Sequence, residues 1–456
     1  MMKRLHIFTI TLVILTLTCI KASGGIMLDI DGEESTSIGV YIKEIGPDGK
    51  ILAEQNAGQA LTPASVMKLV TTATALSEIG DSYRFQTKVY LTGTRSAQNK
   101  TVWNGNMVIE SSADPTLESS SFKDNIGFCE KIAKALKAKS ITRINGKIIV
   151  EESLSDAGPV SKWEIEDVAW PYGCGLFGLN YRDNTFLLYP ATKVCKPEVP
   201  GLDVEVRKTK SGNDLVRGIE SKHLVVYTTN PNNKKWCVQC SMPYPAEVLA
   251  YELKSKLAAA GITVSNSKSA SRDGNTLLYT HLSPKSSDIM RNLMVHSDNL
   301  FAEGILRTLA PSASRKKAIE REKEIWNSRG INADYTIIND GSGLTRANRL
   351  SAEFIGNVLE WMATSEYAGT YTGFFPKAGK EGTLKSFLKD TPLEGRLILK
   401  TGSVSSVQAY AGYKIDDEGK PTHVVVIMVN GFFCPRKEVR LAIQNLLEEV
   451  FPDQAI

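Results

Sequence analysis

The chain has 456 residues, of which 42% are apolar, and its 54 basic and 50 acidic side chains give a formal net charge of +4. A chain of this length exceeds the core of one ordinary domain, so two or three globular domains are expected. The nearly balanced charge, with no basic block, argues against a nucleic acid as partner.

Residues 1–24 have the layout of a secretory signal peptide. Lys3 and Arg4 precede an apolar run over residues 5–20, and small residues follow up to Gly24. That run is short for a membrane span, and no later stretch is long enough to be one. We therefore expect an exported protein of the periplasm or cell envelope. Cys19 leaves lipid modification as a minority alternative, and peripheral membrane association stays open.

The first predicted elements are a strand pair over residues 37–43 and 50–53 and a helix over 62–79. Short strands broken by Asn, Gly and Pro then dominate until about residue 245. These strands are expected at 85–91, 106–110, 146–151, 185–189, 202–206 and 223–227.

A helix over 245–260 and a strand over 276–281 follow, and the chain turns helical from about residue 285. Strands at 396–400, 407–413 and 423–429 precede a final helix. The simplest interpretation is one α/β domain that is built from both ends of the chain and interrupted by a β-rich insertion.

The helix over 62–79 carries the first candidate site. Thr62 is expected to cap it, and Pro63 suits its first turn. Ser65 and Lys68 are three residues apart and share one face. A lysine amine that desolvation makes neutral can take the proton of a serine hydroxyl, and a helix N-terminus offers N–H groups to an oxyanion. The pair predicts an acyl-transfer nucleophile. The same spacing occurs at two places that we interpret as solvated surface, Ser265 to Lys268 and Ser314 to Lys317.

Two further motifs lie in the second half of the chain. One is His296-Ser297-Asp298-Asn299, and the other is the strand end Lys400-Thr401-Gly402-Ser403. Gly402 would let a substrate backbone approach the strand edge closely. Ser-x-x-Lys, Ser-Asp-Asn and Lys-Thr-Gly in this order are the motif set of penicillin-binding proteins and class A β-lactamases.

The cysteines and histidines indicate no metal site. Cys19 is one of seven cysteines, and the pairing of the other six cannot be read from the sequence. Cys237-x-x-Cys240 is half a metal motif without a second half, so a disulfide or two free thiols is the preferred interpretation. The five histidines are scattered, which argues against a histidine triad or a zinc site.

With these motifs, the chain resembles a class C low-molecular-mass penicillin-binding protein of the D-alanyl-D-alanine carboxypeptidase/endopeptidase type, over about residues 36–450. The long interval between Ser65 and Ser297 also fits, because this family inserts two nested domains there. Four more motifs carry the resemblance: Ala113-Asp114-Pro115-Thr116-Leu117, Asp340-Gly341-Ser342-Gly343-Leu344-Thr345-Arg346, Gly382-Thr383-Leu384 and Ala411-Gly412-Tyr413.

The resemblance implies an α/β fold. A β-lactamase/transpeptidase-like domain, an antiparallel sheet flanked by helices, would hold a large β-rich insertion of two nested domains. The expected parts are the signal peptide 1–24, the transpeptidase-like domain 25–83 and 286–456, the inserted domain 84–185 and 246–285, and a nested β-rich subdomain 186–245.

The resemblance also implies catalytic roles. Ser65 would attack the carbonyl between two D-alanines while Lys68 takes its proton, and Ser297 would relay a proton to the leaving amine. Asn299 would hold Lys68 and the substrate amide. Lys400 would supply the positive charge that keeps Lys68 neutral and attracts the substrate carboxylate. No metal or organic cofactor would be required.

The substrate site would use the same strand end. Thr401 would bind the substrate carboxylate, and the backbone N–H groups of Ser65 and Ser403 would form the oxyanion hole. The predicted substrate-binding residues are Thr401, Gly402, Ser403, Ser342, Leu344 and Arg346.

Side-chain specificity is less clearly indicated. Family members that cut meso-diaminopimelate peptides often use an Asp of the insertion and the Arg of the Asp-Gly-Ser-Gly motif to hold the zwitterionic end of that side chain. Arg346 is present, whereas Glu151 stands where Asp is usual. Ser403 replaces a commoner Thr, and Ser386 stands near the place of a usual basic residue.

The expected function is that of an exported serine DD-peptidase. It would hydrolyse peptidoglycan stem peptides or cross-links through a Ser65 acyl-enzyme, with β-lactams as covalent inhibitors. The same triplet leaves two alternatives, a serine β-lactamase or esterase and a non-catalytic cell-wall or β-lactam-binding protein. Carboxypeptidase and endopeptidase action break the same kind of bond, so both stay open.

Overall fold

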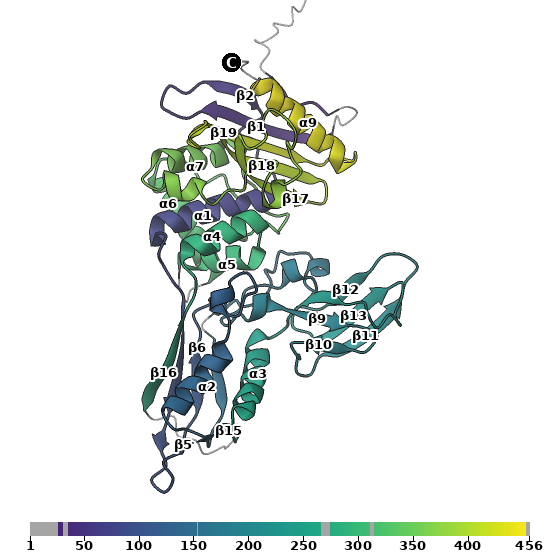
Figure 1. The fold of residues 1–456 in the computed structure, drawn as a ribbon. Helices are drawn as coiled ribbons and strands as arrows, with labels where there is room; N and C mark the ends of the chain where they lie inside the picture. The colour runs from purple at the N-terminus through teal and green to yellow at the C-terminus, as the bar shows by residue number, and fades with distance from the viewer. Residues whose placement is uncertain (1–25, 31–34, 153, 266–273, 311–313, 453–456) are drawn as a thin grey trace, which may run out of the picture.

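The computed structural model describes residues 26–30, 35–152, 154–265, 274–310 and 314–452 (Figure 1). The predicted signal peptide, with Cys19, lies outside these residues, as does Lys268. Across the described ranges, no helix is both long and apolar enough to cross a membrane.

A five-stranded antiparallel sheet joins the two ends of the chain. Ser37 pairs with Asn430 and Glu44 with His423, so the first strand lies beside the last one. The antiparallel sheet that the sequence predicted is therefore present. Its strand order is β17 (Leu397–Val404), β18 (Val407–Ile415), β19 (Pro421–Asn430), β1 (Ser37–Glu44) and β2 (Ile51–Gln55).

Helices cover both faces of this sheet because its strands alternate between two apolar faces. On β19, Val424, Val426 and Met428 belong to the core that includes α1 (Met67–Ile79) and α7 (Ala352–Thr364). Their neighbours Val425, Ile427 and Val429 pack with α9 (Arg436–Val450), which lies on the other face (Figure 1). The sheet and its helices form the main domain.

Four more helices complete the main domain: α4 (Ser286–His296), α5 (Asn299–Arg307), α6 (Arg315–Ser328) and α8 (Ala368–Thr372). Ser314 caps α6, because its hydroxyl accepts a hydrogen bond from the backbone N–H of Lys317. That Ser-x-x-Lys pair therefore has a structural role.

The segment between α1 and α4 forms the insertion, which extends away from the main domain (Figure 1). It leaves along β3 (Gln86–Thr92) and returns along β16 (Asn275–Leu282), and these two strands pair antiparallel. Their sheet has the order β16-β3-β6-β8, with β6 (Met107–Glu110) and β8 (Ile148–Glu151). A second sheet has the order β15-β7-β5-β4, with β15 (Thr263–Val264), β7 (Arg143–Ile144), β5 (Val102–Asn104) and β4 (Thr94–Arg95).

Helices α2 (Phe128–Ala138) and α3 (Pro245–Ala259) pack in the core of the insertion. The helix predicted over 245–260 is thus confirmed. Short 3-10 turns are η2 (Lys123–Asn125), η3 (Ile165–Asp167), η4 (Pro171–Gly173), η5 (Arg182–Asn184) and, in the main domain, η6 (Gly382–Leu384).

Two three-stranded sheets project to one side of the insertion (Figure 1). The first is β10-β9-β14, with β10 (Val194–Lys196), β9 (Thr185–Tyr189) and β14 (Val238–Ser241). The second is β11-β13-β12, with β11 (Asp203–Lys208), β13 (His223–Thr228) and β12 (Asp214–Arg217). Cys237 and Cys240 at β14 are free thiols, which decides between the two interpretations of that motif. The exact boundaries of the inserted domain and of its nested subdomain remain a prediction.

Candidate active site

Ser65 lies in a 3-10 turn, η1 (Ala64–Val66), that leads directly into α1. Ala64 has a φ of +46°, in the left-handed region that non-glycine residues seldom adopt. Such strained conformations persist only where the surrounding structure enforces them, and they gather at functional sites. The turn therefore presents Ser65 in a locally enforced conformation.

The predicted cap by Thr62 is wrong. The turn has no side-chain cap. The Thr62 hydroxyl instead donates to the backbone oxygen of Arg346 at 3.2 Å and accepts from Arg349 Nη1 at 2.8 Å. The hydroxyl is therefore bonded to the 346–349 segment and not to the start of the helix. Thr62 thus connects the Ser65 turn with the loop that carries Arg346.

Lys68 is fully buried on α1, and its amine contacts three oxygen atoms. Nζ lies 3.0 Å from Ser65 Oγ, 2.7 Å from Asn299 Oδ1 and 2.6 Å from the backbone oxygen of Ser342. A neutral amine has two N–H donors and one lone pair. Asn299 Oδ1 and Ser342 O are acceptors, so they take the two donors and leave the lone pair for the Ser65 hydroxyl. The geometry suits proton removal from Ser65.

The electrostatic surroundings bring this amine close to neutrality. Burial lowers the pKa of Lys68 from 10.5 to about 8, because a charged amine is poorly solvated in the interior. Nearby acidic side chains oppose this shift: Asp340, Asp298 and Glu303. Burial also raises the pKa of Asp298 to about 6, although its carboxylate accepts the backbone N–H of Phe301 and so caps α5.

Ser297 and Lys400 form a second hydroxyl–amine pair. Ser297 follows α4 in a left-handed conformation with a φ of +61°. Lys400 on β17 is fully buried, and its Nζ lies 2.9 Å from Ser297 Oγ and 2.7 Å from the backbone oxygen of Thr401. The motifs predicted from the sequence thus meet in space.

The charge relation between the two lysines differs from the expectation. Burial, and after it the proximity of Lys68, lowers the pKa of Lys400 well below its usual value. Two buried amines in one site cannot both carry a proton at low cost, and the carboxylates lie on the side of Lys68. Burial, rather than Lys400, is the main cause of the lowered pKa of Lys68.

Gly402 brings β17 against the Ser65 turn. A Cβ atom at this position would lie 2.7 Å from the backbone oxygen of Pro63 and 3.1 Å from the backbone nitrogen of Ser65. Real Cβ atoms do not approach backbone oxygens this closely. The glycine is therefore needed for contact with the protein's own backbone, whereas the substrate approach expected from the sequence remains a prediction.

A cavity of about 350 Å³ opens beside these groups. Two of its lining residues, Asp167 and Tyr172, come from the insertion, and Asn299 Nδ2 donates to the backbone oxygen of Tyr172 at 2.9 Å. Both parts of the protein thus build the cavity. It is lined by Ser65, Asp167, Tyr172, Ser297, Asn299, Gly343, Leu344, Arg346, Ser403, Val404 and Ser405.

The predicted site residues lie at different places relative to the cavity. On the cavity wall are Ser65, Ser297, Asn299, Leu344, Arg346 and Ser403. Lys68 and Lys400 are buried behind it. Ser342, predicted to bind substrate, is also fully buried and reaches the site through its backbone oxygen on Lys68. The Thr401 hydroxyl donates to Thr383 Oγ1 at 2.8 Å.

Glu151 lies outside this site, which corrects the expectation for the acidic residue of the insertion. It ends β8, pairs with Glu110 and lines a different cavity. Asp167 is the acid that shares the cavity with Arg346. The pKa of Asp167 is raised, mainly by burial. The hydrogen bond from Tyr172 Oη at 3.0 Å and the charge of Arg346 oppose this shift.

The sequence analysis identified neither Asp167 nor Tyr172. Asp167 is one of three acids in the run Glu164-Ile165-Glu166-Asp167. No local pattern marks which of them faces the cavity. Glu164, from the same run, lies 3.9 Å from Arg346 Nε through Oε1, and both side chains are about half exposed.

Known proteins resemble this chain over nearly its whole length. The D-alanyl-D-alanine carboxypeptidase DacB of Haemophilus influenzae is 25% identical over 429 residues, which cover 88% of this chain and 86% of that protein. The D-alanyl-D-alanine carboxypeptidase of Actinomadura sp. (strain R39) is 24% identical over 414 residues, covering 83% and 75%.

Solved structures share the fold. Penicillin binding protein 4 (dacB) from Haemophilus influenzae matches with a TM-score of 0.79 at 23% identity, over 92% of this chain and 97% of that one. The transpeptidase-like domain with its β-rich insertion, predicted from the sequence, is thereby confirmed. The family description "D-Ala-D-Ala carboxypeptidase 3 (S13)" matches residues 27–450, and the chain belongs to this family.

Proposed function

We propose that Ser65 is the nucleophile with which this D-Ala-D-Ala peptidase cleaves peptidoglycan stem peptides, and that Lys68 is its base. One observation carries the proposal. Lys68 Nζ contacts two acceptors and the Ser65 hydroxyl, so a neutral amine directs its lone pair at Oγ.

Acylation would begin at Ser65 Oγ, which bonds to the carbonyl carbon between two D-alanines while its proton passes to Lys68. The oxyanion would be held by the backbone N–H groups of Ser65 and Ser403, which the close packing of β17 at Gly402 supports. Collapse breaks the C–N bond, the leaving amine receives a proton by way of Ser297, and D-alanine departs. Water then cleaves the ester and restores Ser65.

Lys400 would couple substrate binding to this chemistry. Burial disfavours the charged form of its amine, since the pKa of Lys400 is well below the usual value. A substrate carboxylate placed near Lys400 and Thr401 would favour the charged form. A charged Lys400 would then disfavour a proton on Lys68. Binding of the anionic end of the substrate would thus prepare the base.

Arg346 and Asp167 would recognise the side chain of the third stem-peptide residue. They present a cation and an acid to the same cavity as Ser65. A side chain that ends in both an ammonium and a carboxylate, as in meso-diaminopimelate, would satisfy both. This pair replaces the Glu151 interpretation.

Digestion of isolated muropeptides by the purified protein, read by mass spectrometry, tests the activity. Loss of one D-alanine from pentapeptides would establish carboxypeptidase action, and conversion of cross-linked dimers to monomers would establish endopeptidase action. S65A is the control and should release neither product. If the unaltered protein leaves all muropeptides intact, the proposal fails and a non-catalytic cell-wall or β-lactam-binding protein is favoured. Rapid turnover of penicillin without muropeptide cleavage would favour a β-lactamase.

The N-terminal signal pattern supports export to the periplasm or cell envelope, where peptidoglycan is found. β-Lactams would acylate the same serine as covalent inhibitors. Cell fractionation with an antibody against the mature chain tests the location, and a cytoplasmic protein would contradict it.

A further inference from the structure

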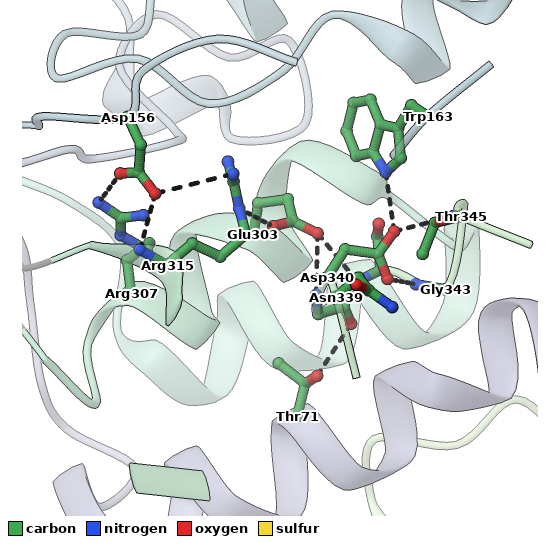
Figure 2. A network of polar contacts seen from close by, with 12 residues as sticks. Thr71, Asp156, Trp163, Glu303, Arg307, Arg315, Asn339, Asp340, Gly343 and Thr345 are labelled. Atoms are coloured by element: carbon green, nitrogen blue, oxygen red, sulfur yellow. Dashed lines mark hydrogen bonds and ion pairs between the residues drawn. The ribbon is translucent and has the colours of Figure 1, made fainter. Parts of the chain in front are cut away.

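Two buried carboxylates, those of Glu303 and Asp340, accept hydrogen bonds from one turn (Figure 2). The carbonyl oxygen of Ser342 in this turn contacts Lys68. Glu303, on α5, accepts the backbone N–H groups of Gly341 and Ser342 through Oε1, each at 3.0 Å. The Thr71 hydroxyl donates to the backbone oxygen of Gly341 at 2.9 Å. The peptide unit that precedes the Ser342 carbonyl is therefore fixed from two helices, α1 and α5.

Asp340 fixes the other side of the same turn (Figure 2). Its Oδ1 accepts the N–H of Gly343 at 2.9 Å and Asn348 Nδ2 at 2.7 Å. Its Oδ2 accepts the N–H of Thr345 at 2.9 Å and the indole N–H of Trp163, from the insertion, at 2.7 Å. With both carboxylates in place, the Ser342 carbonyl has little freedom to turn away from Lys68.

Burial, and after it the negative charge of Asp340, raises the pKa of Glu303, whereas its hydrogen-bond partners and Arg315 favour the ionised form. Besides the two backbone donors on Oε1, its Oε2 accepts Arg315 Nε at 3.2 Å. All three contacts are donors, and Arg315 is the counter-ion. The backbone N–H of Arg315 is in turn bonded to Asp156 Oδ2 at 2.7 Å, so a residue of the insertion supports the cation as well (Figure 2).

Glu303 can thus act on Lys68 in two ways. Through the backbone it holds the Ser342 oxygen that lies 2.6 Å from Nζ. Through space its negative charge raises the pKa of Lys68 against the effect of burial. The charged and titratable groups that face Lys68 or Glu303 are Asp298, Asp340, Lys400, Arg315 and Glu322.

We propose that Glu303 is a positioning residue for the base: it holds the Ser342 carbonyl that aims the lone pair of Lys68 at Ser65, and its negative charge acts on the Lys68 amine. The proposal rests on the role of Lys68 given above. Glu303 is not among the residues that line the cavity.

The test is the pH dependence of acylation by a fluorescent penicillin, measured with the full chain by stopped flow. E303Q keeps an oxygen for the two backbone N–H groups, removes the charge and places an amide donor where Oε2 accepts Arg315 Nε. Loss of a nearby anion favours the neutral amine, so the rising limb of the acylation profile should move to lower pH by about one unit. Thermal unfolding shows whether the variant is folded.

Two further variants separate charge from geometry. E303D keeps the charge on a shorter side chain, so its limb should stay in place while the plateau rate falls roughly tenfold. E322Q is the matched control. Glu322 is fully buried and contacts Thr74 rather than the Ser342 turn, and burial raises its pKa to about 8. Its charge is not among those that shift the pKa of Lys68, so E322Q should leave the rising limb unmoved.

The outcomes are distinct. The proposal is overturned if the acylation rate of E303Q rises at the same pH as that of the parent. It is also overturned if E322Q shifts this rise by the same amount as E303Q. If E303Q fails to unfold cooperatively, E303D decides, and a plateau equal to that of the parent refutes the positioning role. A parent enzyme that penicillin does not acylate would remove the proposed function first, and this inference with it.

Discussion

Asn299 joins Lys68 to the insertion: its Oδ1 lies 2.7 Å from Lys68 Nζ, and its Nδ2 donates to the backbone oxygen of Tyr172 at 2.9 Å. One amide therefore contacts both the residue that would activate Ser65 and a 3-10 turn of the insertion. Because amide oxygen and nitrogen have opposite roles, the contact with Tyr172 also determines which atom faces the lysine. The insertion thus helps to orient the groups around Ser65, in addition to forming one wall of the cavity.

Lys68→Arg tests the base. A guanidinium does not lose its proton in proteins, so the variant keeps a cation but cannot accept the proton of Ser65. Acylation by fluorescent penicillin should fall by about two to four orders of magnitude, the usual contribution of a general base. Stopped-flow labelling measures the rate, and circular dichroism checks the fold. A folded variant that is acylated at nearly the parent rate would show that the proton goes elsewhere.

The pH dependence of the parent enzyme follows from the lowered pKa of Lys68. The amine is active when neutral, and its pKa is about 8 in the folded protein. The acylation rate should therefore rise with pH and level off above about pH 8. An unperturbed lysine titrates near 10.4, so an acylation rate that rises only around that pH would mean that burial does not lower the pKa of Lys68. Rates measured with a neutral penicillin ester as well as with penicillin exclude titration of the ligand.

Arg346→Ala tests side-chain recognition. A bidentate arginine–carboxylate contact worth about 1–3 kcal/mol changes specificity roughly 5- to 100-fold. The variant should lose kcat/KM on peptides with a free meso-diaminopimelate end, and much less on matched lysine peptides. Asp167→Asn should likewise lower kcat/KM more on the meso-diaminopimelate peptides than on the lysine peptides, since it removes the partner of the ammonium group. Equal losses on both peptides would mean that Arg346 mainly pairs with Glu164 and stabilises its loop.

Gly402→Ala tests the contact between β17 and the Ser65 turn. The new methyl group would meet the backbone oxygen of Pro63 at 2.7 Å and must displace the strand or the turn. A displacement of about 1 Å in a reacting group can cost on the order of 100-fold in rate, so acylation should fall by about that factor. Gly369→Ala is the matched control, because its Cβ would meet nothing within 4 Å. Similar rates for both variants would contradict this role of Gly402.

The predicted part boundaries can be tested by limited proteolysis. If residues 84–285 are a separate unit, first cuts should fall near residues 84 and 285, where the chain passes between α1 and β3 and between β16 and α4. N-terminal sequencing and intact mass identify the cut sites. Cleavage scattered evenly through both parts would argue against these boundaries.

The sequence by itself determined the elements that carry the chemistry. Ser65 and Lys68 are three residues apart, in the turn η1 and in the helix α1 that continues it, and Ser297 and Asn299 are two residues apart between α4 and α5, so the proximity within each pair is local and can be read from spacing. The continuous apolar run of β19 similarly predicts a strand buried on both faces. The order of the three motifs along the chain was enough to indicate the family.

Only the tertiary structure decided how the motifs act on one another. Asp167, and not Glu151, lines the cavity with Arg346 because the path of the insertion, and not its local sequence, brings η3 to the cavity. Ser342 acts through its carbonyl, a group that every residue has and that no sequence pattern reveals. The lowered pKa of Lys68 has the same origin: desolvation depends on everything that packs around the amine, and most of those atoms are far away in the chain.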